Sequence, residues 1–285
     1  MGNKMKALAG IVLFNPDIER LTQNIAAILP QIDCIVCVDN GSSNLDEVKG
    51  SLPTQVVLIE NGRNLGIAAA LNRILCFADK HGYEWFLTLD QDSVCEDGLI
   101  DAYLSYRDLP SAAMLTCRII DRNFVNESSE KADELPKEIE ECITSASFCM
   151  TEALKAVGGF DEQMFIDSVD FDICMNLRKH GYMVYRIPFV GLLHEVGHGK
   201  NVRLLWKKRV VYNHSALRNY YIARNHVYMA RKYPDDVSLF KTRIKELEAE
   251  ILILLYEEDK IKKLRARRLG VKDAGNMRMG ECTWL

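Results

Sequence analysis

The sequence predicts an α/β fold with a mostly parallel central sheet, followed by a helical C-terminal extension. The first half of the chain alternates continuous apolar runs with helix-like segments, a pattern typical of parallel strands covered on both faces. Polar turns follow several of these runs, and from Arg203 onward the pattern is helical. We therefore expect one domain over residues 1–200 and a basic, aromatic extension over residues 201–285.

Each expected element has a local signal. Ala7–Phe14 and Cys34–Val38 are continuous apolar runs, as expected for buried parallel strands. A helix begins at Asn15-Pro16-Asp17, since Pro is favoured in a first turn, and runs to about Leu29. The other expected strands are 56–59, 85–89 and 143–150, and the other expected helices are 66–81, a short one ending at 158–159, and one from 169 to 180.

The polar stretch 121–141 has weak periodicity, so we expect a loop there. The helix that begins near Val169 has acids in its first turn and cations in its last, followed by Gly181. Both features agree with helix capping and with the helix dipole.

Charge is distributed unevenly along the 285 residues. The net charge is −4, yet residues 196–234 contain no Asp or Glu and nine Lys or Arg. This asymmetry indicates an anionic partner for one surface. No nucleic-acid-binding module accompanies the charge, so nucleic acid is a poor fit.

The cysteines and the apolar runs indicate a protein of a reducing compartment. The nine Cys residues are spread along predicted strands and helices, which favours buried free thiols. Cys34 and Cys37 lie three apart on one strand and so face opposite sides. The apolar runs near the N-terminus and at 251–256 are too short to cross a bilayer. We expect a cytoplasmic protein, and peripheral contact with the inner face of the cell membrane is compatible with this expectation.

Asp90 and Asp92 stand two apart at the carboxyl end of an apolar strand, where ligands bind in open α/β sheets. With Gln91 turned away, both carboxylates can face one cation. Carboxylate oxygens suit Mg²⁺ or Mn²⁺, and such an ion can hold a diphosphate through its free positions. The alternative is a pair of solvated turn aspartates.

Two further turns carry ligand-binding groups. Asp39-Asn40-Gly41-Ser42 follows the second strand, where a base and a ribose could be held, although a plain polar turn is the alternative. The segment from Asn61 to Gly66 precedes a helix and places Arg63 and backbone N–H groups near an anion.

Together these segments resemble the family 2 glycosyltransferases over about residues 5–200. The resemblance rests on Val38–Ser42, Asn64-Leu65-Gly66 with Asn72, Leu87–Asp92, Gly158–Glu162 and Phe165–Asp170, in this order. The segments Leu89–Ser93, Phe165–Asp170, His214–Tyr221 with Arg224-Asn225, and Gly270–Ala274 are similar to bacterial polysaccharide rhamnosyltransferases.

The resemblance implies the GT-A fold and a role for each matching residue. Asp170 would be the general base. Asp90, Asp92 and His194 would bind Mn²⁺ or Mg²⁺. The nucleotide-sugar would be held by Phe14, Asn15, Asp39, Asn40, Arg63, Asn64, Asp90 and Gln91.

Other residues compete for two of these roles. Asp167 and Asp172 flank the expected base. Asp172 would point about 200° away from Asp170 on a helix, and Asp167 could cap the helix or touch the acceptor. For His194 the alternative is a structural histidine. His198 is a second candidate ligand, but Gly191, Gly197 and Gly199 favour a loop.

The implied activity is metal-dependent, inverting transfer of a sugar from a nucleotide-sugar to an acceptor hydroxyl. The best donor is dTDP-rhamnose, and the acceptor is a saccharide or a polyprenyl-linked saccharide in cell-surface polysaccharide biosynthesis. A UDP-linked hexose or galactofuranose is an alternative donor. A nucleotidyltransferase would carry a glycine-rich basic loop after its first strand, where Phe14–Asp17 stands instead. A non-catalytic nucleotide-sugar-binding partner is the third class.

Residues 203–232 interleave aromatic side chains with cations. Three interpretations remain open for this region. It could be a surface helix on anionic lipid. It could be a helix packed on the catalytic domain with solvated charges. Finally, Arg218 or Arg224 could hold substrate phosphates.

Overall fold

The computed structural model describes residues 6–121, 135–194, 199–204 and 206–277, without the side chains at 120, 121, 193 and 194. These residues divide into two compact units. The first contains the described residues up to Glu162 and from Asp170 to His194. The second contains Gln163–Val169 and the described residues from 199 to 277.

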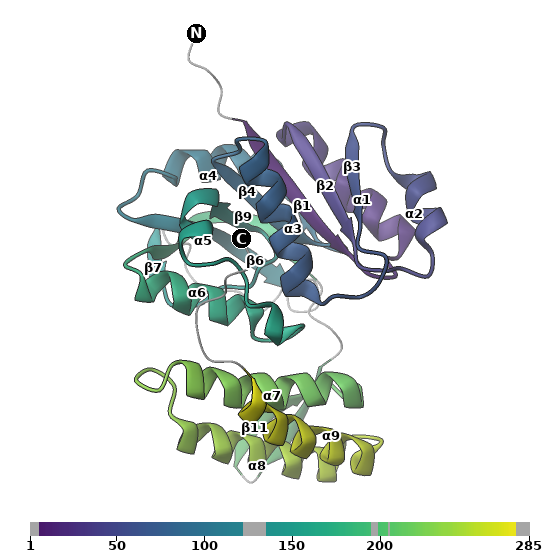
Figure 1. Ribbon diagram of the computed structural model, residues 1–285, viewed down its shortest axis with the longest axis vertical. Helices are drawn as coiled ribbons and strands as arrows, with labels where there is room; N and C mark the ends of the chain where they lie inside the picture. Colours follow the sequence, from purple (N-terminus) through teal and green to yellow (C-terminus); the bar gives the residue numbers. More distant parts are fainter. Residues whose placement is uncertain (1–5, 122–134, 195–198, 205, 278–285) are drawn as a thin grey trace. The chain divides into compact units, whose positions relative to one another are not determined.

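The first unit is a mixed α/β structure around one large, mostly parallel sheet, which confirms the predicted fold class (Figure 1). Its strands are β1 Ala7–Leu13, β2 Cys34–Asp39, β3 Val56–Glu60, β4 Trp85–Asp90, β5 Val94–Cys95, β6 Ala112–Asp121, β7 Lys137–Ile139, β8 Ser147–Met150 and β9 Met183–His194. Its helices are α1 Ile18–Ile28, α2 Leu45–Ser51, α3 Ile67–Lys80, α4 Leu99–Tyr106, α5 Thr151–Ala156 and α6 Val169–Lys179.

The strand order is β3-β2-β1-β4-β8-β6-β9-β5, with β7 also paired to β9. Strands β1 to β4 run parallel to their neighbours in the group, and β6 runs parallel to β9. Strands β5, β7 and β8 pair antiparallel. The carboxyl ends of β1, β2, β3 and β4 therefore lie at one edge of the sheet.

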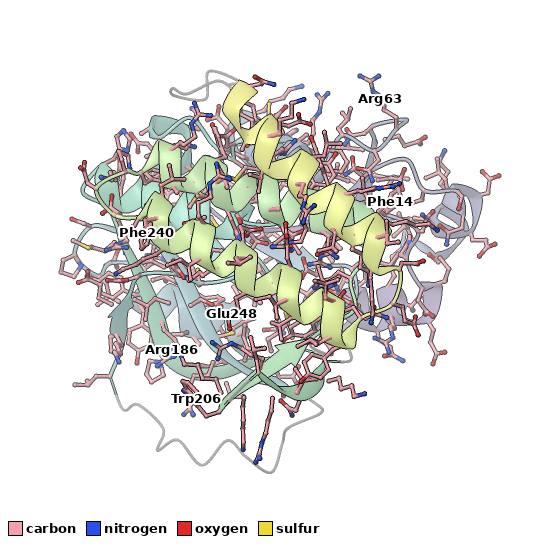
Figure 2. The ribbon with its side chains drawn as sticks, turned by 90° about the horizontal axis from the view of Figure 1, so that it is seen from below. Phe14, Arg63, Arg186, Trp206, Phe240 and Glu248 are labelled. Carbon is pink, nitrogen blue, oxygen red and sulfur yellow. The ribbon has the colours of Figure 1, made fainter. Side chains whose placement is uncertain are left out.

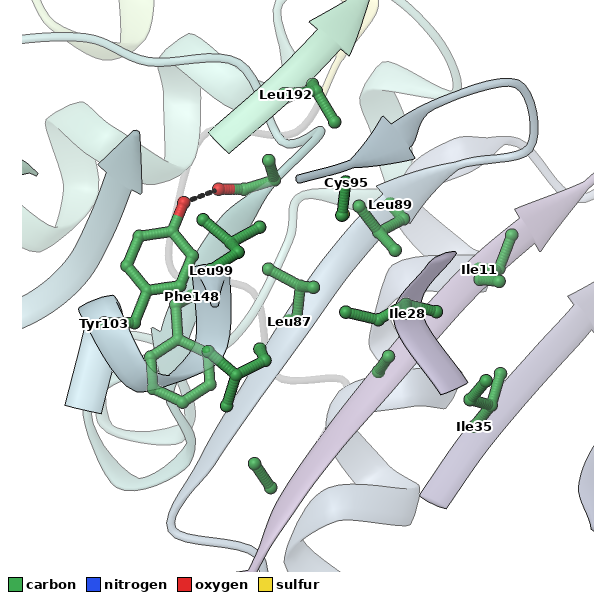
Figure 3. Close-up of a cluster of buried hydrophobic side chains, with 14 of the residues drawn as sticks. Ile11, Ile28, Ile35, Leu87, Leu89, Cys95, Leu99, Tyr103, Phe148 and Leu192 are labelled. Atoms are coloured by element: carbon green, nitrogen blue, oxygen red, sulfur yellow. Dashed lines mark hydrogen bonds between the residues drawn. The ribbon is translucent and has the colours of Figure 1, made fainter. Parts of the chain in front are cut away.

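Helices cover both faces of the sheet. On one face, alternate residues of β1 such as Ile11 pack in a buried cluster with α1 residues such as Ile28 and with Tyr103 of α4 (Figure 3). On the other face Gly10 meets α3, where a Cβ would lie 2.3 Å from Cγ2 of Ile74. Gly10 is thus required because α3 approaches the strand so closely.

The second unit consists of three helices and a β-hairpin. Its elements are β10 Lys200–Leu204, β11 Lys207–Val211, α7 Ala216–Lys232, α8 Leu239–Tyr256 and α9 Lys260–Asp273. Helix α7 packs against both α8 and α9. Two buried side chains join the last two helices, since Nη2 of Arg267 lies 2.5 Å from Oε2 of Glu246.

Three local expectations were wrong. Residues 203–232 do not form one helix, because 200–204 and 207–211 form the antiparallel β10–β11 hairpin. The expected loop at 121–141 contains β7, while residues 122–134 lie outside the described part. Gly191, taken as a loop signal, lies within β9, where a Cβ would come 2.4 Å from Leu99.

Among the helices of the described ranges, none combines the length and the apolar character needed to cross a bilayer. Burial raises the pKa of the Cys37 thiol to about 12, and it also raises the pKa of Cys34. Both thiols are therefore held in the protonated form near neutral pH, which disfavours redox chemistry at the CxxC segment.

Candidate active site

The register of the parallel strands brings the predicted turns together. Leu13 of β1 pairs with Asp39 of β2, and Val12 pairs with Asp90 of β4. Phe14, Asp39 and Asp90 therefore lie side by side at the carboxyl edge of the sheet, where open α/β sheets bind ligands.

The turn after β2 is built around the fully buried side chain of Asp39. Its carboxylate accepts hydrogen bonds from the backbone N–H groups of Gly41 (2.9 Å) and Ser42. The Ser42 hydroxyl accepts from the Asn15 N–H at 2.9 Å, and the Asn15 side chain accepts from the Ser43 N–H at 2.7 Å. The turns after β1 and β2 are thus fixed to each other.

Asn40 joins the β2 turn to the loop before α3. Its side-chain oxygen accepts from the Leu65 N–H at 3.1 Å, and its amide donates to the Asn64 side chain at 3.2 Å and to the Gly66 carbonyl at 3.0 Å. Gly41 has φ +84°, and a Cβ there would lie 2.7 Å from the backbone of Arg63. These contacts position the exposed Arg63, whose side chain extends away from the ribbon (Figure 2).

Gln91 binds the backbone rather than its acidic neighbours. Its Oε1 accepts from the Phe14 N–H at 2.9 Å, so the side chain ties the end of β4 to the end of β1. Asn24 of α1 donates to the Asp90 carbonyl at 2.7 Å. The Asp90 residue is half-buried and Asp92 is exposed.

Two carboxylates at this edge are a suitable donor set for a hard cation that keeps open positions for a ligand. Within the described residues, no group of three or more His, Cys, Asp or Glu side chains is gathered as a cation site. The side chain of His194, at the end of β9, and the whole of His198 lie outside the described part of the chain.

The loop between β7 and β8 contacts both the end of β4 and α6. Ser145 accepts from the Asp90 N–H at 3.3 Å, and Cys142, three residues earlier, lies 3.7 Å from Cys174 of α6, measured between the sulfur atoms. Cys174 is one helical turn after Asp170. The loop therefore contacts both the end of β4 and the first half of α6.

The three aspartates near the start of α6 differ in their surroundings. Asp170 is half-buried in the first turn, whereas Asp172 is buried at 1% exposure. Asp167, in the second unit, accepts a hydrogen bond from Nη2 of Arg218 at 3.2 Å. Burial, followed by the Arg218 charge, lowers the pKa of the neighbouring His214.

The segment before α6 has an unusual backbone that the sequence did not reveal. Phe165, Asp167 and Ser168 all have positive φ, at 63°, 67° and 63°. Fully buried Asn225 of α7 donates from its amide to the carbonyls of Met164 (2.9 Å), Ile166 (2.8 Å) and Asp167 (2.7 Å). These bonds hold a strained segment in place.

Arg224 is part of the same arrangement. Its Nη2 donates to the carbonyls of Gln163 and Met164 (2.9 Å), and its guanidinium lies 4.7 Å from the centre of the Tyr221 ring. The Arg224-Asn225 pair was noted from the sequence as a motif and Arg224 as a candidate phosphate ligand, and the contacts of the pair with this segment were missed. These contacts disfavour a phosphate-binding role for Arg224.

A known family model matches most of the part of the chain that carries this strand edge. The family model described as "Glycosyl transferase family 2" matches residues 9–160. A curated relative, "dTDP-rhamnosyl transferase RfbF" of Shigella flexneri, is 28% identical over 280 residues, covering 93% of this chain and 94% of the relative.

Solved structures with low sequence identity share the fold. GalNAc-T7, solved with UDP, GalNAc and Mn²⁺, matches with a TM-score of 0.61 at 14% identity, covering 97% of this chain and 57% of its own. The mannosyltransferase PcManGT from Pyrobaculum calidifontis, solved with GDP-Man and Mn²⁺, matches with a TM-score of 0.59 at 15% identity, covering 98% and 77%. S. aureus TarS 1-349 with UDP-GlcNAc matches with a TM-score of 0.59 at 13% identity, covering 92% and 79%. The GT-A-like fold expected from the sequence is therefore confirmed, and the chain belongs to glycosyl transferase family 2.

Proposed function

We propose that this chain transfers rhamnose from dTDP-rhamnose, with inversion, to a saccharide or polyprenyl-linked acceptor in cell-surface polysaccharide biosynthesis in the cytoplasm. The observation that carries the proposal is the alignment of Phe14, Asp39 and Asp90 at the carboxyl edge of the sheet. The nearly end-to-end match to a dTDP-rhamnosyl transferase supports the donor. A UDP-linked hexose or galactofuranose is the alternative donor.

In this proposal the ends of β1 and β2 hold the nucleotide. Phe14, Asn15, Asp39 and Asn40 would flank the base and the ribose. The Asp39 and Asn40 side chains are engaged within the chain, so they would act by fixing the turn that the nucleotide contacts. Exposed Arg63, with Asn64, Asp90 and Gln91, would lie near the ribose and phosphates.

Asp90 and Asp92 would hold Mn²⁺ or Mg²⁺, with His194 as the third candidate ligand. A half-buried and an exposed carboxylate fit a cation that binds substrate phosphates through its remaining positions. When bound, the cation neutralises charge that develops on the leaving diphosphate.

Asp170 would be the general base. A sugar hydroxyl is a weak nucleophile near neutral pH, so a carboxylate within hydrogen-bond reach must accept its proton as the new bond to the anomeric carbon forms. The bond between that carbon and the diphosphate oxygen breaks in the same displacement, which inverts the configuration. The burial of Asp172 and the ion pair of Asp167 with Arg218 support Asp170 over both.

The test is calorimetric titration with dTDP-, UDP- and GDP-sugars in Mn²⁺ and in EDTA, together with a turnover assay on the same variants. We expect metal-dependent binding of dTDP-rhamnose that is lost in Asp92→Ala and kept in Asp170→Asn, which loses turnover instead. The exposed Asp101→Ala in α4 is the matched control and keeps both. Binding that is equal in EDTA would contradict the metal assignment. Full turnover in Asp170→Asn would contradict the base, and binding without turnover in the wild type would favour a non-catalytic partner.

A further inference from the structure

Helix α8 carries a continuous apolar stripe on its exposed side. We call this the α8 stripe: Phe240, Ile244, Leu247, Ile251, Leu254 and Leu255. The spacing of four, three, four and three residues keeps the first five on one face of the helix. Phe240 is 74% exposed and Leu247 is 59% exposed, so the stripe is far more open than a core-facing surface.

The opposite face of α8 already supplies its packing. Thr242, Glu246 and Ile253 are buried on α8, and they lie on the side of the helix away from the stripe. Glu246 binds Arg267 of α9 and His226 of α7. The helix is thus held by one face, while the stripe remains exposed.

The second unit exposes further apolar residues. Helix α9 adds Ile261, 67% exposed, and the β10–β11 hairpin adds Trp206, 83% exposed. Arg209 of the hairpin binds Glu248 of α8 at 2.5 Å, which fixes the hairpin along the helix. Figure 2 shows Phe240 near one end of α8 and Trp206 at the hairpin turn. An exposed Trp beside Lys207 is a common residue at a bilayer interface.

The charge around the stripe is positive. Residues 200–277 contain 19 Lys or Arg and 9 Asp or Glu. Two acids beside the stripe, Glu248 and Glu250, are already paired with Arg209 and Arg268. Other cations of helices α8 and α9 are exposed, namely Lys241, Arg243, Lys245, Lys262 and Arg265.

This combination selects among the occupants that an apolar helix face can take. A second copy of the chain would bring an equally positive surface against the first, which like charges disfavour. An amphipathic helix with an apolar stripe and Lys or Arg beside it is typical of a protein that lies in the interface of an anionic bilayer. The charge therefore favours lipid.

We propose that the α8 stripe docks on a bilayer surface that contains anionic phospholipid. The stripe enters the boundary between headgroups and acyl chains, and the surrounding Lys and Arg side chains contact lipid phosphates. This surface goes beyond the transfer reaction, since it depends on neither the donor nor the base. The apolar stripe lies on α8, outside residues 203–232, where the sequence had suggested a lipid-binding helix, and the hairpin residues around Trp206 overlap with that range.

The experiment is flotation of the full chain with two kinds of vesicle, one of phosphatidylcholine alone and one that also contains about a third phosphatidylglycerol. The anionic lipid is included because each basic residue near an anionic surface strengthens binding. We expect the protein to float with the anionic vesicles, to float less at high salt, and to stay behind with neutral vesicles. Leu247→Glu should weaken binding about tenfold, because it removes one apolar anchor and adds a negative charge. Leu135→Glu, at a 75% exposed Leu of the first unit, is the matched control and should float like the wild type.

Two further measurements keep the result unambiguous. Donor titration should be unchanged in Leu247→Glu, so failure of lipid docking and failure of the proposed transfer are separable. Circular dichroism checks that the variant is folded. Equal flotation of Leu247→Glu and wild type would overturn the proposal. So would a wild-type dimer that this substitution converts to a monomer without changing flotation, since the stripe would then bind a second copy.

Discussion

Asn225 is expected to control both stability and turnover. Its amide, with two hydrogens, serves the carbonyls of Met164, Ile166 and Asp167, so at least one hydrogen is shared. Replacement by Ala removes roughly two net hydrogen bonds and leaves acceptors in a buried site unsatisfied. At about 1–2 kcal/mol for each, the loss is about 2–4 kcal/mol of unfolding free energy. That is less than the typical total of about 5–15 kcal/mol, so the variant should still fold.

The assay is guanidinium denaturation together with steady-state turnover. We expect a lower denaturation midpoint in Asn225→Ala, and turnover that falls more than donor affinity, because the segment leads directly into the turn that bears Asp170. Asn225→Asp keeps the volume but places a carboxylate against the carbonyls, so it should be at least as harmful. Asn201→Ala, at an exposed Asn of β10, is the control. The reasoning would be refuted if Asn225→Ala had the same denaturation midpoint and the same turnover as Asn201→Ala. If Asn225→Asp were fully tolerated, the effect of Asn225→Ala would come from lost side-chain volume and not from lost hydrogen bonds.

Three further predictions concern two sites of the second unit and one helix of the first. Gly270→Ala should lower the unfolding free energy by about 1–3 kcal/mol, since its Cβ would lie 2.3 Å from a backbone oxygen of α7. Gly50→Ala in α2, with open space around it, should instead stabilise by up to about 1 kcal/mol in the same denaturation assay. Burial opposes ionisation of Glu246, but the hydrogen bond from His226 and nearby positive charge outweigh it and lower the pKa of that carboxyl below 4.5. The ionised Glu246 carboxylate therefore stabilises the folded state above pH 4.5, and this stabilisation is lost as the pH falls through the lowered pKa. The stability difference between wild type and Glu246→Gln should shrink from pH 7 to pH 3, and an unchanged difference would contradict this assignment.

The strand and turn pattern of β1 to β4 was predictable because it is local, whereas β5, β6, β7 and β9 were not expected. Continuous apolar runs such as Cys34–Val38 are typical of strands in a sheet that is covered on both faces. The parallel register then brings Asp39 and Asp90 to one edge without further information. The side-chain partners of this edge were not predictable. That Gln91 binds the Phe14 backbone depends on two turns whose exact course the pattern does not specify.

Other features depend on contacts that are distant in sequence. The β10–β11 hairpin was taken for helix because Trp206 occupies its turn in place of the usual Gly, Asn or Asp. Gly191 was taken for a loop residue, but it lies in β9. A glycine is needed at this position of the strand because Leu99 of α4 leaves no room for a Cβ. Phe165 and Ser168 have the positive φ that such residues rarely adopt, and contacts from α7 hold this segment in place.

The bonds from α7 to the 163–168 segment also affect the timing of synthesis. They join residues that are 58 to 61 positions apart. At roughly 5–20 residues per second, a ribosome needs about 3–12 s to add that length of chain. The sheet can form while α7 is still being translated, whereas the segment that leads to Asp170 gains its partners only afterwards. A nascent chain should thus form the strand edge proposed to bind the nucleotide before Asp170, the proposed base, is in position.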